Sequence, residues 1–151
     1  MSTKAVDVLN DLIKTCNDGK KGFAKAAEKV KREDLRHVLL AGATRCADSA
    51  AELAALVRSL GGEPATGGSA AGALHRGWVE LKADVAGNTE LSVLEEVERG
   101  EDSAKESYQQ ALKDDALVGN LRLVIERQFS GVLDNHRRVR ELRDDLRRVA
   151  A

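Results

Sequence analysis

The stretch that decides the fold is residues 118–149, VGNLRLVIERQFSGVLDNHRRVRELRDDLRRV. Apolar side chains recur in it at alternating intervals of three and four residues, which is the period of one face of an α-helix. The positions on this face are Val118, Leu121, Ile125, Gln128, Val132, Asn135, Val139, Leu142, Leu146 and Val149. Gln128 and Asn135 thus occupy positions that the pattern reserves for the core. Buried amides need hydrogen-bond partners, so polar groups are expected to meet inside the protein.

Three more long stripes of helical period precede this one. They cover about residues 3–31, 33–60 and 89–114, and the last of these puts Glu101 on its core face. Thr3, or the serine before it, can cap the first helix, and Asn88 or Thr89 can cap the third. Asp115 is expected to cap the fourth. Gly61 and the glycine after it end the second helix.

Composition supports a single all-helical domain covering residues 1–151. The chain has one proline, 3% aromatic residues and 13 glycines, and this length can bury a core without disulfides. Charged residues make up 32% with a formal net charge of -1, so we expect neither nucleic-acid binding nor attraction to an anionic membrane. The arginines after residue 136 alternate with acids, as on a solvated helix face. We find no bilayer-length apolar run and no amino-terminal signal core, so we expect a cytoplasmic protein.

The links between the helices predict how they are arranged. The first and last links are short, whereas the middle one contains a loop at 63–72 and a short amphipathic helix through Leu74, Trp78, Leu81 and Val85. Short links join antiparallel neighbours, and a long middle link lets the second and third helices run parallel. The predicted fold is therefore a ferritin-like four-helix bundle whose crossover carries a short helix.

Hairpin geometry predicts which polar residues share a level. A first hairpin folded near residues 31 and 32 places Asp18 opposite Arg45, and a second folded near 115 and 116 places Glu101 opposite Ser130. Stacking the two hairpins gives one polar layer, made of Asp18, Arg45, Glu98, Glu101, Asp102 and Gln128. We interpret it as a hydrogen-bonded and ion-paired layer that fixes helix register at a cost in desolvation.

Five segments resemble an uncharacterised bacterial family of ferritin-like four-helix-bundle proteins of unknown function. They are Leu9-Asn10-Asp11-Leu12-Ile13, Asp18-Gly19-Lys20-Lys21-Gly22-Phe23, Gly72-Ala73-Leu74-His75-Arg76-Gly77-Trp78, Glu98-Arg99-Gly100-Glu101-Asp102 and Glu126-Arg127-Gln128-Phe129, with His136 beyond. The resemblance covers nearly the whole chain. It implies a ferritin-like fold and brings no established activity.

Metal-binding relatives within the ferritin-like superfamily suggest an alternative, an iron or manganese carboxylate site. Such sites take a Glu from each of two helices and a Glu-x-x-His pair from each of the other two. Neither Glu-x-x-His pair is present here, since Glu126 is followed three residues later by Phe129. The candidate ligands are Asp18, Glu98 and Glu101, with Arg45 competing for them. We therefore expect no cofactor, and keep iron or manganese as the alternative.

Three functions remain open from the sequence. The first is a non-catalytic bundle that works by association, as a homo-oligomer or with a protein partner. The second is the metal-binding protein, and the third is a redox-responsive protein that uses Cys16 and Cys46 as a thiol pair. Both cysteines lie on core stripes, and packing is the favoured role because buried cysteine behaves as a small apolar residue. The His75-Arg76-Gly77-Trp78 string is expected to pack locally or to form a partner surface.

Overall fold

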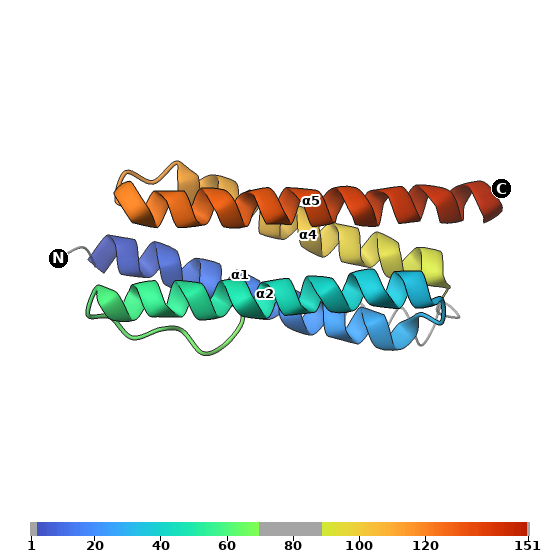
Figure 1. Ribbon diagram of the computed structural model, residues 1–151, viewed down its shortest axis with the longest axis horizontal. Coiled ribbons are helices and arrows are strands. Elements are labelled where there is room, and N and C mark those ends of the chain that lie inside the picture. The colour runs from blue at the N-terminus through green and yellow to red at the C-terminus, as the bar shows by residue number, and fades with distance from the viewer. Residues whose placement is uncertain (1–2, 70–88, 151) are drawn as a thin grey trace.

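The computed structural model describes residues 3–69 and 89–150, and these residues form four helices and no strand. The helices are α1 (Thr3–Lys29), α2 (Glu33–Ser59), α4 (Glu90–Leu112) and α5 (Gly119–Ala150). They lie alongside one another as a four-helix bundle (Figure 1). The prediction of an all-helical protein with four long helices is confirmed. The predicted crossover helix, with His75 and Trp78, lies outside the described residues.

Each helix contacts two others. The contacting pairs are α1 with α2, α4 with α5, α1 with α4, and α2 with α5. In Figure 1, α1 and α5 run in one direction while α2 and α4 run in the other. Every contacting pair is therefore antiparallel, and α2 and α4 are parallel to each other.

Hydrogen bonds and backbone conformation at single residues explain where the helices begin and end. The Thr89 side chain accepts a hydrogen bond from the backbone N–H of Ser92, which confirms one of the two predicted caps of α4. At the end of α2, Gly61 has a φ of 81°, and the N–H of Gly62 bonds to the Val57 carbonyl at 3.0 Å. This left-handed turn is one that glycine adopts without strain.

The start of α5 differs from the prediction that Asp115 caps it. Asp114 instead accepts a hydrogen bond from the N–H of Ala116 at 2.9 Å, which stabilises a turn, and α5 begins only at Gly119 with a φ of +58°. The link after α4 thus covers residues 113–118. As a result, α5 is displaced along α4 relative to the tight hairpin expected from the sequence.

The core consists of two apolar clusters. One includes Leu9, Leu53 and Ile125, and the other includes Leu35 and Leu94. The predicted stripe of α5 is buried in its middle, but Val118 and Val149 at its ends are 66% and 83% exposed. Val118 precedes the helix, and Val149 lies in its last turn.

Small and polar side chains separate the two clusters on every helix. Passing from one cluster to the other crosses Gly19 on α1, Ser49 on α2, Glu101 on α4 and Asn135 on α5. The small and polar positions that separate the two clusters on the four helices therefore lie in the middle of the bundle.

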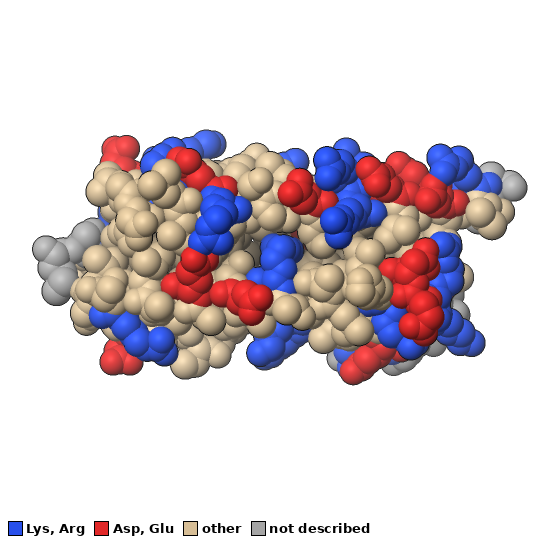
Figure 2. Space-filling view, in the orientation of Figure 1, with Lys and Arg blue, Asp and Glu red and all other residues tan. Residues whose placement is uncertain are grey.

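The surface carries charges of both signs. Figure 2 shows Lys and Arg side chains interleaved with Asp and Glu side chains on the face formed by α2 and α5. Within the described part of the chain, none of the helices combines the length and apolar character needed to cross a membrane.

Candidate functional site

A chain of polar contacts joins all four helices. The Tyr108 hydroxyl donates to Gln128 Oε1 at 2.8 Å and lies 3.3 Å from Cys16 Sγ. Gln128 Nε2 in turn donates to Glu52 Oε1 at 2.8 Å and lies 3.4 Å from the Ser49 carbonyl oxygen. We call Cys16, Tyr108, Gln128 and Glu52 the tyrosine relay. Tyr108 and Gln128 are buried, so each supplies the partner that burial of the other requires.

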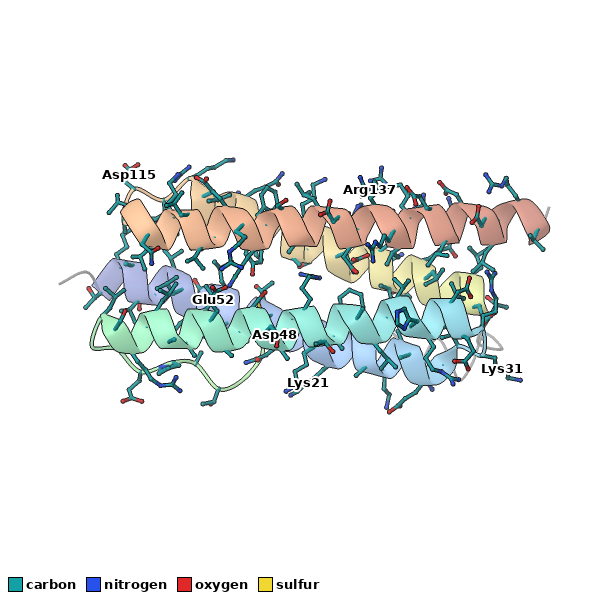
Figure 3. All side chains as sticks on the ribbon, in the orientation of Figure 1. Lys21, Lys31, Asp48, Glu52, Asp115 and Arg137 are labelled. Carbon is teal, nitrogen blue, oxygen red and sulfur yellow. The ribbon has the colours of Figure 1, made fainter. Side chains whose placement is uncertain are left out.

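Glu52 connects this relay to the surface. It lies on the side of α2 that faces α5 in Figure 3, whereas Arg137 points away from the bundle. Its second carboxylate oxygen, Oε2, is paired with Arg127 of α5. One carboxylate therefore binds an amide inward and a guanidinium outward, and α2 and α5 are joined at this level.

Glu101 and Asn135 form a second polar contact. Asn135 Nδ2 donates to Glu101 Oε2 at 2.8 Å, and Glu101 is only 4% exposed. Its other oxygen, Oε1, is buried without a hydrogen-bond partner. Burial raises the pKa of Glu101 to about 7, although the Asn135 hydrogen bond and the Arg45 charge oppose the rise. The buried site therefore favours the neutral, protonated carboxyl group over the carboxylate.

Arg45 approaches the same region from α2. A Cβ on Gly131 of α5 would lie 3.5 Å from Arg45 Cδ, which is an ordinary contact distance, so the arginine stem passes close to this part of α5. Arg45 Nη2 lies 3.9 Å from Cys46 Sγ, and its Nε is buried without a partner. Asp18, predicted to face Arg45, accepts a hydrogen bond from the Ser69 backbone N–H at 3.1 Å.

A cavity of about 500 Å³ adjoins these groups. Most of its wall comes from α1 and α4, while Arg45, Cys46, Ser69 and Val132 complete it. Three of the predicted polar residues, Asp18, Arg45 and Glu101, line it. The volume falls within the roughly 300 to 1,000 Å³ of small-molecule sites.

The two cysteines are free, buried, and line this cavity. Burial raises the pKa of Cys46 to about 12, with Arg45 opposing the rise, and burial likewise raises the pKa of Cys16. Both thiols stay protonated at neutral pH. Because the thiolate is the reactive form, their environment suits packing better than redox chemistry.

A different group of residues offers metal ligands. Glu98 and Asp102 of α4 and His136 of α5 each present a ligand atom, and these atoms lie within 4.8 Å of one another. His136 Nε2 is 2.8 Å from Asp102 Oδ1, and Glu98 is paired with Arg143. This cluster contains one of the three predicted ligands, Glu98. The other two, Asp18 and Glu101, are not part of it.

The displacement of α5 explains how the predicted residues are distributed. Glu101 contacts Asn135, which lies further along α5 than the expected Ser130, and Gln128 contacts Tyr108. The expected pairing of Glu101 with the Ser130 region is therefore wrong. The link at 113–118 is longer than the expected tight turn, so a later residue of α5 comes level with Glu101.

Sequence reasoning missed Tyr108 as a polar participant because its ring fits the apolar stripe of α4. The sequence does contain a signal for this contact. A buried tyrosine hydroxyl needs a hydrogen-bond partner, and Gln128 is a core amide that needs one too. It also missed Glu96, which is 2% exposed and lies 3.6 Å from Arg99.

Comparison with protein families gives a match that covers most of the chain. A family model described as domain of unknown function (DUF2383) matches residues 4–114, which contain α1, α2 and α4. A search of curated proteins finds no match.

Proposed function

The chain belongs to the DUF2383 family, and we propose that it is a non-catalytic ferritin-like bundle in which a polar layer takes the place of a di-metal site. The observation that carries this proposal is the tyrosine relay. It joins one side chain from each helix through contacts among the side chains themselves. Together with the contact between Glu101 and Asn135, this relay makes up the polar layer of the proposal, and the layer fixes the register of the four helices.

The helix directions support the ferritin-like part of the proposal. The helices α2 and α4 run the same way although they are consecutive among the described helices, so the end of α2 and the start of α4 lie at opposite ends of the bundle (Figure 1). One long connection with two antiparallel hairpins is the arrangement of ferritin-like bundles.

The chemical groups of the tyrosine relay support a structural role. A thiol, a phenol and an amide form most of the relay, and its one carboxylate, Glu52, already binds Gln128 and Arg127. The usual di-metal site instead needs several carboxylates and two histidines directed at the same point. Slipping one helix by a turn would leave Gln128 and Tyr108 buried without partners, which costs about 1 to 3 kcal/mol for each group.

Metal analysis tests this proposal. The protein is purified without chelator or affinity metal after growth with added iron and manganese, and its metal content is measured. We expect substoichiometric metal in the wild type and unchanged content in Glu101→Gln. One or two ions per chain, lost in Glu101→Gln, would overturn the structural reading of the layer.

The cluster of Glu98, Asp102 and His136 favours a second candidate function, binding of a single iron or manganese ion. Two carboxylates and an imidazole are suitable ligands for such an ion. These residues fit a metal ion only in part, because Glu98 is already paired with Arg143 and the Asp102 side chain is 62% exposed. Stoichiometric metal that is lost in His136→Gln but kept in Glu101→Gln would establish this function. Equal metal content in both variants would reject it.

We also propose that the bundle acts as a homo-oligomer in the cytoplasm. Several large apolar side chains are exposed on α2 and α5, namely Leu40, Leu123 and Leu133. Light scattering during size-exclusion chromatography tests the association: a purely monomeric protein at high concentration would reject it.

A further inference from the structure

Two arginines of α5 lie against the cluster that offers metal ligands. Arg143 is paired with Glu98, and Arg140 Nη2 lies 3.4 Å from His136 Nδ1. The two arginines are three residues apart in one helix, so they project from the same side of it. We propose that these guanidinium groups are the native cations of the cluster and that they exclude a divalent metal ion from it.

The proposal rests on the second candidate function, because exclusion has a meaning only if Glu98, Asp102 and His136 can hold an ion. It goes beyond that function by giving a role to two residues that are not metal ligands. That role is to keep the affinity of the cluster for metal low in the native protein.

Arg143 is bound to the more buried of the two carboxylates in the cluster. The side chains of Glu98 and Arg143 are each 15% exposed, whereas that of Asp102 is 62% exposed. Arg143 donates to Glu98 and also, through Nη2, to Asp144 Oδ1 at 2.9 Å, so two carboxylates hold the guanidinium in place. A metal ion that takes Glu98 as a ligand therefore has to displace Arg143 or bind beside its positive charge.

The hydrogen bonds of His136 hold its ring in a form that does not bind metal. Its Nε2 lies 2.8 Å from Asp102 Oδ1, and because a carboxylate only accepts, Nε2 carries the proton. Its Nδ1 faces Arg140, and because a guanidinium only donates, Nδ1 keeps its lone pair. In metal-binding histidines, by contrast, the nitrogen away from the ion donates to an acceptor. Ligation through Nε2 would place the proton on Nδ1 opposite Arg140, and ligation through Nδ1 would displace Arg140 directly.

The two arginines thus act on different ligands of the same cluster. Arg143 neutralises Glu98, and Arg140 fixes the tautomer of His136. A divalent ion at these ligands would also be repelled by both positive charges, and such repulsion is strong at short range in partly buried surroundings.

Calorimetric titration of Mn²⁺ into the metal-free full chain tests the proposal. Arg143→Met removes the charge and keeps most of the side-chain length, so we expect it to bind about one Mn²⁺ per chain at least tenfold more tightly than the wild type. Arg140→Met should also tighten binding. Arg143→Lys keeps the charge and should bind Mn²⁺ as weakly as the wild type does.

Arg147→Met is the matched control. Arg147 joins the same two helices through Glu95, at 2.8 Å, but neither residue belongs to the cluster. Its loss removes one ion pair between α4 and α5 and should leave the Mn²⁺ affinity unchanged.

The outcomes separate this proposal from the metal-binding function on which it rests. Equal Mn²⁺ affinity in the wild type and in a folded Arg143→Met protein would overturn exclusion by arginine and leave the metal site standing. If Arg143→Met does not fold, the same comparison with Arg140→Met decides. Absence of Mn²⁺ binding in the wild type and in both methionine variants would overturn the metal site and the proposal together. Tight binding that survives His136→Gln in the Arg143→Met background would place the ion elsewhere and would also overturn the proposal.

Discussion

The pH dependence of stability at Glu101 can be worked out from the structure. Burial among α2, α4 and α5 raises the pKa of Glu101 from 4.5 to about 7 in the folded protein. Between these values the folded state holds a proton that the unfolded state has released. The contribution of Glu101 to stability is therefore complete below pH 4.5 and is lost as the pH rises through about 7. A rise from 4.5 to about 7 corresponds to roughly 3 kcal/mol.

The substitution that removes this effect is Glu101→Gln, which keeps the size of the side chain and stays neutral. Urea unfolding of the wild type and the variant at pH 5, 6, 7 and 8 gives the difference in the free energy of unfolding at each pH. We expect this difference to shift in favour of the variant by about 2 to 3 kcal/mol between pH 5 and 8. The other carboxylates titrate in both proteins and cancel.

Glu106→Gln, at an exposed position on the same helix, is the matched control and should show a difference that does not change with pH. A constant difference for Glu101→Gln across the same range would refute the argument from burial. A shift in the opposite direction would mean that the Arg45 charge outweighs desolvation and holds the carboxylate ionised.

Three further predictions use the packing of the bundle. Gly22→Ala should stabilise α1 by about 0.5 to 1 kcal/mol, because alanine favours the helix. Gly19→Ala should destabilise the protein, because a Cβ at residue 19 would lie 2.7 Å from Cys46 Sγ. Thermal melting compares the two variants, and equal melting temperatures would contradict the close contact between Gly19 and Cys46. Tyr108→Phe should cost about 1 to 3 kcal/mol in urea unfolding because it leaves Gln128 Oε1 without its donor, and no loss would show that the relay is not needed. Both thiols should react slowly with a disulfide reagent at pH 8 in the native protein and fast after unfolding; fast native labelling would show that the cysteines are accessible.

Much of the polar interior could be anticipated residue by residue. Gln128 and Asn135 break an apolar stripe, and both are buried with hydrogen-bond partners. Glu101 interrupts the stripe of α4 in the same way and is also buried. These positions were readable because helical period alone decides which side of a helix faces the core.

The hydrogen-bond partners of these residues could not be predicted from helical period. The sequence predicts that Asp18 faces Arg45, and it gives no sign that Ser69 donates to Asp18, which happens because the chain after α2 runs back alongside α1. Tyr108 fits an apolar position in the sequence pattern, whereas in the structure its hydroxyl contacts both Cys16 and Gln128. The cavity could not be foreseen either, since empty space depends on how far apart two helices pack.

The sequence by itself determined the four helices, their core faces and the positions at which the core faces of α4 and α5 become polar, because these depend on periodicity and local propensity along one chain. The tertiary structure decided which polar groups meet. A helix that slides along its neighbour by a turn keeps the same face toward the core, so periodicity does not fix register. Here the turn at Asp114 and the late start of α5 set it, and they place Asn135 beside Glu101 and Gln128 beside Tyr108.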